Sequence, residues 1–225
     1  MLYSRVARQH WFVAISESQK SMAPENLRWA GVVYNGILMD RYPFREDKDD
    51  YLFFLGRADE EKAPHLAIQA ARQAGRRLVM CATTKNERER GYWAANVEPI
   101  LGGDVEVHGE CPHELKADLL ARARALLFPI QWAEPFGLVM TEAMASGTPV
   151  IAWRNGSVPE VVADGETGFI VESVEEMAAA IDRVGDLDPR AMRSWVQDRF
   201  SAEAMVLGYE RAYERALVGE RSPQS

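Results

Sequence analysis

Short runs of apolar residues alternate with longer amphipathic stretches from residue 51 onward. The runs YLFFLG and RLVMCA have the length of buried strands, and APHLAIQAARQAG has the apolar spacing of a helix that stops near Gly75. The alternation continues through the candidate strands VEVHG, ALLFP, PVIAW and GFIV. It predicts an α/β fold, a doubly wound parallel sheet with helices on both faces.

Residues 1–50 do not follow this alternation. WFVAIS is a candidate strand, Asn35-Gly36 is a turn signal, and the polar RYPFREDKDD is typical of a linker. The chain therefore divides into 1–34, a linker at 35–50, an α/β domain at 51–200, and a C-terminal helix and tail at 201–225. The later helices are expected at Glu87–Ile100, Pro112–Arg124, Phe136–Ala145, Val158–Ala163, Val174–Val184, Arg190–Arg199 and Ala202–Leu217.

Composition and charge exclude several classes of protein. Of the 225 residues 47% are hydrophobic and 27% are charged, which is typical of a soluble globular chain. The net charge of -8, without a run of lysine or arginine, argues against a nucleic-acid partner. No apolar run approaches the ~20 residues of a membrane span. Only two cysteines are present, too few for a disulfide framework, so we expect a reducing, cytoplasmic location.

Familiar catalytic and metal motifs are missing from the sequence. It contains no G-x-G-x-x-G, no Walker A lysine loop and no G-x-S-x-G elbow. His113-Glu114 is not followed by a second histidine at zincin spacing, and the cysteines are too isolated for a structural zinc site. We expect neither a metal nor another cofactor.

Two glutamates in the stretch EPFGLVMTEAMASGTPVIA are the main candidates for a binding site. Glu134 follows the strand ALLFP, so it lies at the carboxyl end of the sheet, where α/β folds bind ligands. Glu142 follows about two helical turns into the next helix, and its two carboxylate oxygens suit a vicinal diol such as a ribose. Glu134 could accept hydroxyl groups of a second sugar. The alternative role of Glu134, stabilisation of a helix N-terminus, remains open.

The helix between these glutamates offers an anion site. Its first turn is expected to begin at Phe136, where backbone N–H groups without internal partners favour a phosphate. Gly137 lets a ligand approach the backbone closely. The turn consists of Phe136, Gly137, Leu138 and Val139.

Two cations are expected at the same edge of the sheet. FLGRADEEK places Gly56 and Arg57 after the first regular strand and Lys62 before the next helix. An arginine fork and a lysine point charge together can neutralise a diphosphate. In GSVPE, by contrast, Ser157 and Glu160 have the spacing of a capping box, so we assign them to helix capping and not to the site.

These segments together resemble family 4 (group 1) retaining glycosyltransferases of the GT-B fold. The likeness runs from about Phe12 to Phe200, and the E-x7-E stretch beside G-T-P-V is its most specific part. The resemblance implies transfer of a sugar from a nucleotide-diphosphate donor with retention of configuration. It implies that Arg57 and Lys62 hold the diphosphate, that Glu142 binds the ribose, and that Glu134 binds the donor sugar. Gly109, Glu110 and Cys111 would face the base.

The likeness to the N-terminal domain of these enzymes is slight, because only Arg8–Gln19 resembles its last strand and turn. Residues 1–34 are therefore interpreted as a remnant of the acceptor domain, and we expect this chain alone to be catalytically incomplete. We also expect self-association, or binding of a partner chain, through residues 1–30 and the last helix. Two alternatives stay open: a non-enzymatic nucleotide-sugar-binding subunit, and a glycosidase that uses Glu134 and Glu142 as an acid/base pair.

Overall fold

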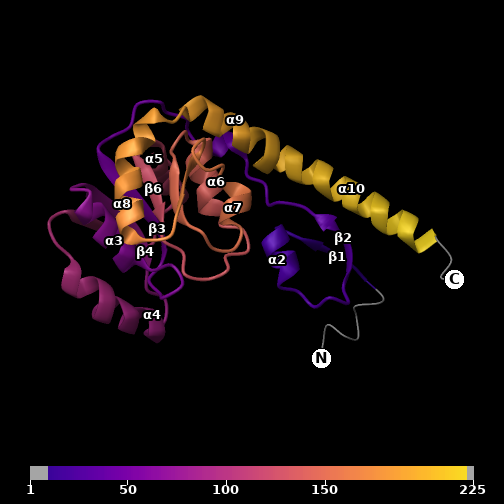
Figure 1. Ribbon diagram of the computed structural model, residues 1–225, viewed down its shortest axis with the longest axis horizontal. Coiled ribbons are helices and arrows are strands. Elements are labelled where there is room, and N and C mark those ends of the chain that lie inside the picture. Colours follow the sequence, from indigo (N-terminus) through magenta and orange to yellow (C-terminus); the bar gives the residue numbers. More distant parts are fainter. Residues whose placement is uncertain (1–9, 222–225) are drawn as a thin grey trace.

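The computed structural model describes residues 10–221 and contains the predicted parallel sheet (Figure 1). Six strands pair in the order β5-β4-β3-β6-β7-β8, all parallel. The chain builds one half of the sheet outward from β3, then returns to β6 and builds the other half. The strands are β3 (Tyr51–Arg57), β4 (Arg77–Thr83), β5 (Val105–His108), β6 (Ala125–Phe128), β7 (Val150–Trp153) and β8 (Gly168–Val171).

Helices cover both faces of this sheet, as the alternation of strands and helices predicted. On one face lie α5 (His113–Arg122), α6 (Leu138–Ala145), α7 (Val158–Val161) and α9 (Pro189–Phe200). On the other lie α3 (Pro64–Gln73), α8 (Val174–Arg183) and a segment made of α4 (Glu87–Tyr92), a π turn (Trp93–Val97) and a 3-10 turn (Glu98–Ile100). Short 3-10 turns also occur at η1 (Met39–Arg41) and η4 (Val184–Asp186).

Side chains of each strand divide between two hydrophobic cores. Phe53 of β3 faces one core and its neighbours Leu52 and Phe54 face the other, all three with an exposed fraction of 1% or less. Because successive side chains of a strand point to opposite faces, a strand buried on both faces is a continuous apolar run. This burial explains why YLFFLG could be recognised as a strand.

Residues 10–34 form a second, smaller unit. Strand β1 (Trp11–Ala14) pairs in parallel with β2 (Arg28–Val32), and the short helix α2 (Glu17–Ser21) connects them. WFVAIS was predicted as a strand, but β2 and α2 were not predicted. Of residues 1–34, which were interpreted as a remnant of an acceptor domain, residues 1–9 lie outside the described residues.

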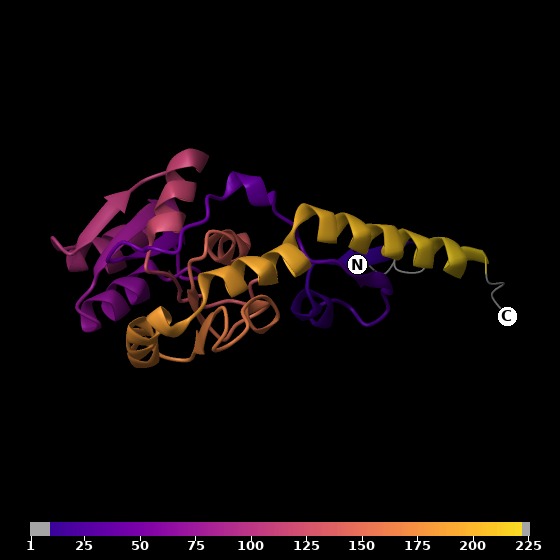
Figure 2. The same ribbon diagram turned by 90° about the horizontal axis from the view of Figure 1, so that it is seen from above.

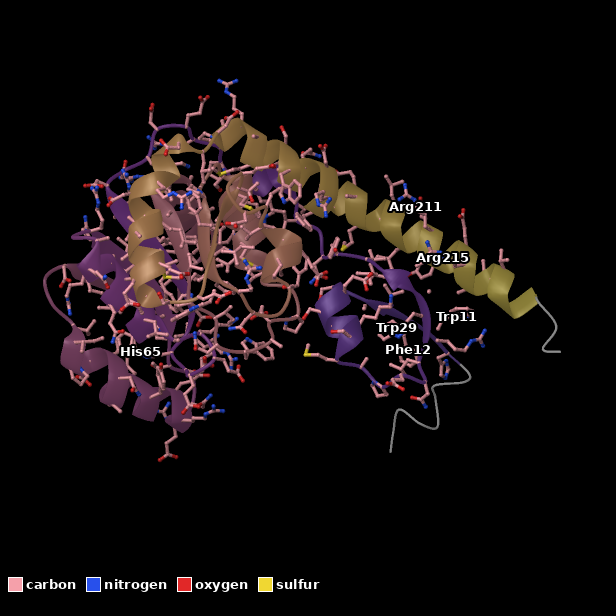
Figure 3. All side chains as sticks on the ribbon, in the orientation of Figure 1. Trp11, Phe12, Trp29, His65, Arg211 and Arg215 are labelled. Atoms are coloured by element: carbon pink, nitrogen blue, oxygen red, sulfur yellow. A yellow bond between two sulfur atoms is a disulfide. The ribbon has the colours of Figure 1, made fainter. Side chains whose placement is uncertain are left out.

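The last helix, α10 (Ala202–Arg221), extends away from the main sheet and lies along this unit (Figure 2). Met205, Tyr209 and Ala212 on α10 pack against Ala30 and Val33. The side chain of Arg215 donates a hydrogen bond of 2.9 Å to the carbonyl oxygen of Ala30 (Figure 3). Three apolar residues of this helix are thus covered by the chain's own β1–β2 unit.

The other side of α10 carries apolar side chains that remain exposed. Tyr213 has an exposed fraction of 62%, and Val206, Leu207, Leu217 and Val218 are exposed by half or more. Self-association through this helix stays a prediction. No helix within residues 10–221 combines the length and apolar content that crossing a bilayer requires.

Residues 35–50 connect the two units and are anchored to the α/β domain. Ile37 pairs with Ser201 as an isolated parallel bridge, and Tyr42 is buried. Lys48 donates hydrogen bonds to the carbonyl oxygens of Ala121 and Ser146 and to the hydroxyl of Thr148, at 2.8 to 3.0 Å. The segment predicted as a linker contains one 3-10 turn and no strand, but it is held in place at several points.

Candidate functional site

The site residues gather where the order of strands reverses. Strand β3 has β4 on one side and β6 on the other, so a crevice forms where the loops after β3 and β6 diverge. Gly56 and Arg57 end β3, and Glu134 lies in the loop after β6. A backbone hydrogen bond of 2.8 Å from Gln131 to the carbonyl oxygen of Glu61 joins these two loops. The topology thus brings together residues that are more than 70 positions apart.

Lys62 and Glu134 form an ion pair in this crevice. The indole N–H of Trp132 donates to the same carboxylate oxygen, Oε2, at 3.0 Å. The Lys62 ammonium also lies 5.9 Å from the centre of the Trp132 ring and 5.4 Å from that of Phe128. The side chains of Lys62 and Glu134 are only 17% and 12% exposed, so their attraction is weakly screened by solvent.

The backbone around Lys62 explains how its side chain reaches Glu134. A Cβ atom at Gly56 would lie 3.3 Å from the Lys62 side chain, so glycine leaves room for the lysine over the end of β3. Ala63, immediately after Lys62, has a φ of 46° and precedes α3. Non-glycine residues in this left-handed region store strain, which concentrates at functional loops.

Arg57 is surrounded by acidic side chains. Its guanidinium lies 2.8 Å from Glu61 and 3.1 Å from Asp59, and Glu89 is 3.9 Å away. Asp59 and Glu89 are nearly buried, whereas Arg57 is half exposed. The buried carboxylates hold the guanidinium at the carboxyl edge of β3, and its exposed side remains accessible to an anion.

Glu142 has a corresponding set of partners that the sequence did not reveal. Its Oε1 atom accepts hydrogen bonds from the Tyr42 hydroxyl and from the Lys116 ammonium, each at 2.7 Å. The ammonium lies 5.6 Å from the centre of the Tyr42 ring. Burial, and next the hydrogen bond to Glu142, raise the pKa of Tyr42 above its ordinary value, so Tyr42 remains a proton donor at neutral pH.

The two glutamates therefore lie in clusters of the same kind, each made of a lysine, an aromatic hydrogen-bond donor and a glutamate. The Lys62 cluster consists of Lys62, Trp132 and Glu134, and the Lys116 cluster consists of Lys116, Tyr42 and Glu142. In each, an ammonium and an aromatic donor share one carboxylate oxygen. Within residues 10–221 no hydrogen bond reaches the other oxygen of either glutamate, so each retains acceptor capacity for a ligand hydroxyl.

The prediction that the helix after Glu134 begins at Phe136 was wrong. Helix α6 begins at Leu138, because Gly137 adopts a φ of 75° and ends the preceding loop. The Phe136 side chain is buried, and its ring centre lies 5.8 Å from that of Phe200. Leu138 and Val139 form the first turn of α6, so they supply the helical N–H groups expected at this place.

Gly109, Glu110 and Cys111 follow β5 at the same edge of the sheet. Gly109 has open space around it, and Glu110 is exposed and paired with Lys85 at 2.9 Å. Cys111 forms a disulfide with Cys81 of β4, with 5.9 Å between their Cα atoms. The two cysteines were expected to form no disulfide framework and to indicate a reducing location. The structure joins them, because neighbouring strands bring together residues that are 30 positions apart. The disulfide ties this loop to the sheet.

The capping box predicted for Ser157 and Glu160 was also wrong. The Ser157 hydroxyl donates to the carbonyl oxygen of Phe136 at 2.9 Å instead of capping α7. The Glu160 carboxylate accepts hydrogen bonds of 2.7 and 2.8 Å from the backbone N–H groups of Glu17 and Ser18, at the start of α2. It also accepts from the hydroxyl of Tyr34, and burial followed by the Glu160 charge raises the pKa of Tyr34 to about 12. Glu160 thus connects the α/β domain to the β1–β2 unit.

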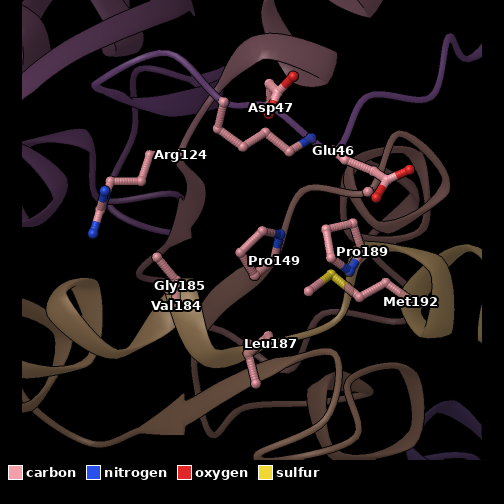
Figure 4. A pocket seen from close by; sticks show the side chains of 11 residues that line it. Glu46, Asp47, Arg124, Pro149, Val184, Gly185, Leu187, Pro189 and Met192 are labelled. Atoms are coloured by element: carbon pink, nitrogen blue, oxygen red, sulfur yellow. The ribbon is translucent and has the colours of Figure 1, made fainter.

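A pocket of about 340 Å³ lies on the opposite edge of the sheet (Figure 4). Arg124 and Pro149, which line it, immediately precede β6 and β7, so the pocket is at the amino ends of the strands. Burial lowers the pKa of its lysine, Lys48, to about 7, but the three acceptors of that lysine are all protein atoms. This pocket contains no counterpart of the two clusters.

Within the described residues, no group of three or more histidine, cysteine, aspartate or glutamate side chains is arranged to hold a metal ion. The positive groups that the candidate site contains are instead Arg57, Lys62 and Lys116. Sequence reasoning found the first two and missed Lys116, Tyr42 and Trp132. Trp132 stands two residues before Glu134 and could have been noticed, whereas Tyr42 and Lys116 are 100 and 26 positions from Glu142.

A family model described as "Glycosyl transferases group 1" matches residues 39–197, well over half of the chain. The chain belongs to this family. Both clusters and Arg57 lie inside the matched region. The glycosidase alternative is thereby disfavoured, and it also lacks support from the geometry, because both carboxylates already bind an ammonium.

Similar proteins agree with the assignment to the group 1 glycosyltransferases. The glycogen synthase of Mycobacterium tuberculosis is 32% identical over 210 residues, which cover 86% of this chain and 50% of that enzyme. Sucrose-phosphate synthase from Thermosynechococcus elongatus has a TM-score of 0.81 and 24% identity over 97% of this chain and 61% of its own. Anabaena HepE, solved with UDP and glucose, has a TM-score of 0.81 and 19% identity over 95% of this chain and 65% of its own.

The two solved structures show that the fold is that of a GT-B C-terminal domain. The chain spans about half the length of the curated relative it matches, so features of the complete relatives do not transfer to it directly.

Proposed function

We propose that this chain is the donor-binding half of a retaining, family 4 glycosyltransferase that uses a nucleotide-diphosphate sugar. The observation that carries the proposal is the pair of carboxylate–lysine–aromatic clusters at the reversal point of the sheet. They place two hydroxyl acceptors on either side of the start of α6. A nucleotide sugar presents a sugar, a diphosphate and a ribose in the same order.

Each group has a role that its chemistry supports. Arg57 and Lys62 bind the diphosphate, assisted by the N–H groups of Leu138 and Val139 at the start of α6. Glu134 accepts hydroxyl groups of the donor sugar, and Glu142 accepts a hydrogen bond from the ribose. The loop of Gly109, Glu110 and Cys111 faces the base. The UDP and glucose bound to the related Anabaena HepE support a ligand of this class.

The catalytic contribution that these residues can make is stabilisation of the leaving group. As the bond between the sugar carbon and the diphosphate breaks, its electron pair passes to the phosphate oxygen, and preorganised cations stabilise that charge. The acceptor oxygen forms the new bond to the sugar carbon, and its proton passes to the departing phosphate oxygen. We propose that no metal is needed, because Arg57 and Lys62 supply two positive charges where the diphosphate binds.

The first test is binding of free nucleotides. Titration calorimetry with UDP, GDP and ADP is expected to show binding of at least one. Its affinity should fall as salt is raised, since contacts with a diphosphate are mainly electrostatic. Absence of heat and of competition with all three nucleotides would overturn the proposal, and binding that is insensitive to salt would contradict the roles of Arg57 and Lys62.

The two glutamates are expected to act on different parts of the donor. Glu142→Ala should weaken binding of the free nucleotide by about 1–3 kcal/mol, the scale of a hydrogen bond to a charged group. Glu134→Ala should leave nucleotide affinity equal or tighter, because Lys62 loses a competitor for phosphate, and should weaken only the nucleotide sugar. Calorimetry with nucleotide and nucleotide sugar separates these effects. Equal losses of nucleotide affinity in both variants would show that the assignment is wrong.

A further inference from the structure

The Lys116 cluster has unused hydrogen-bonding capacity next to the proposed ribose position. Both of the Glu142 bonds from Tyr42 and Lys116 end on Oε1. A carboxylate that binds a vicinal diol by itself uses one oxygen for each hydroxyl. With Oε1 already bound to two protein donors, Glu142 has its second oxygen for one hydroxyl, and the other hydroxyl needs a different partner.

Lys116 is placed to be that partner. An ammonium has three N–H donors, and one of them binds Glu142. The cluster constrains the ammonium on two sides, by the carboxylate at 2.7 Å and by the Tyr42 ring at 5.6 Å. Its side chain is 18% exposed, so it is neither free in solvent nor sealed in the core. A ribose hydroxyl, which accepts as well as donates, can bind between such an ammonium and a carboxylate.

Two further residues, His113 and Arg193, surround Tyr42 in this cluster. The ring of His113 lies 5.4 Å from that of Tyr42, and its buried Nε2 atom has no hydrogen-bond partner among the described residues. Buried polar atoms without partners are uncommon in folded proteins. The backbone of Tyr42 is also anchored, because the side chain of Arg193 donates a hydrogen bond of 3.2 Å to its carbonyl oxygen.

From this geometry we infer that Lys116 is a specificity residue that makes the donor site select ribonucleotides over 2′-deoxyribonucleotides. The inference rests on the proposed function. It adds Lys116 to the binding site and predicts which nucleotides the site prefers. Lys116 donates to the 2′-hydroxyl of the ribose while Oε2 of Glu142 accepts from the 3′-hydroxyl. Tyr42 is a positioning residue, because it acts on the ligand through Glu142.

The experiment compares two nucleotides that differ by one hydroxyl group. The nucleoside diphosphate that binds the wild-type chain most tightly among UDP, GDP and ADP is titrated beside its 2′-deoxy form. The wild type is expected to prefer the ribonucleotide by roughly tenfold or more, the size of one charge-assisted hydrogen bond. Lys116→Met should reduce this preference to about two- or threefold, mainly by weakening the ribonucleotide. Lys116→Arg, which keeps charge and donors, should retain most of the preference.

Controls separate this role from a structural one. Lys20→Met removes an exposed lysine on α2 and should leave both affinities unchanged. If Lys116→Met weakens both nucleotides by the same factor, Lys116 only neutralises Glu142 and the inference is overturned. The same holds if the wild type does not discriminate. Failure of the wild type to bind any nucleotide would instead overturn the proposed function. If Lys116→Met does not fold, Lys116→Gln provides the same comparison with an uncharged donor.

Discussion

Lys62→Met is expected to lower the free energy of unfolding by about 3 kcal/mol, because it leaves the largely buried Glu134 carboxylate without its cation. The indole N–H of Trp132 remains as a donor but carries no charge. Because Lys62 also belongs to the proposed diphosphate site, binding of the nucleotide sugar should fall in the same variant. Urea unfolding and calorimetry measure the two effects.

A double-mutant cycle tests whether the loss comes from the ion pair. Lys62→Met combined with Glu134→Gln should recover much of the stability, since no unpaired charge remains, but it should not recover binding. Lys20→Met breaks an exposed pair with Glu17 and should cost no more than ~1 kcal/mol. If the double variant were as unstable as the sum of its two single variants, the ion pair would not be the cause.

Among glycine-to-alanine substitutions in the site loops, Gly156→Ala is expected to lower the free energy of unfolding the most. Gly156 has a φ of 57°, and an added Cβ would overlap the backbone N and O atoms of Glu134 and lie 2.7 Å from the carbonyl carbon of Ala133. The left-handed conformation costs about 1–2 kcal/mol for alanine and the overlap about 1–3 kcal/mol more, so the unfolding free energy should fall by roughly 2–5 kcal/mol. The displaced Glu134 should also bind a donor sugar poorly.

Gly165 provides a matched control. It has a φ of 79° but nothing within 4 Å of its Cβ position, so Gly165→Ala should cost only the conformational part, about 1–2 kcal/mol, and leave binding intact. Thermal melting and nucleotide-sugar titration of both variants make the comparison. If both variants lost similar amounts of stability and binding, close contact with the Glu134 loop would not be the reason that position 156 requires glycine.

The α/β domain was predictable because its signals are local. Each strand buried on two faces is a continuous apolar run, and each connecting helix has its own apolar spacing. In residues 10–34 the strands are short and only partly covered, and their partners on α10 are far along the chain, so β2 was missed. The start of α6 was misplaced by two residues because Gly137 adopts a left-handed conformation, which the pattern of Phe136 and its neighbours does not record.

The site, like the fold, was predictable where its residues carry local signals in the sequence. Arg57, Lys62, Glu134 and Glu142 were found because they follow strands or occupy an unusual place in an apolar helix. Their partners Tyr42 and Lys116 come from a linker and from another helix, and only the folded sheet brings them together. Glu160 shows the opposite error. Its spacing from Ser157 satisfies a local rule, but a tertiary contact with α2 determines where its carboxylate points.

The contact between α10 and the β1–β2 unit has a consequence for synthesis of the chain. Ala30 and its hydrogen-bond partner Arg215 are 185 residues apart, and Glu160, which binds the start of α2, also comes late. At ~5–20 residues per second, a ribosome needs roughly 10–40 s to make the intervening chain. During that interval Trp11, Val13 and Ala30 have no α10 to pack against. The β1–β2 unit is therefore the part of the nascent chain that waits longest for its packing partner, and we expect it to stay exposed for a time that the speed of translation sets.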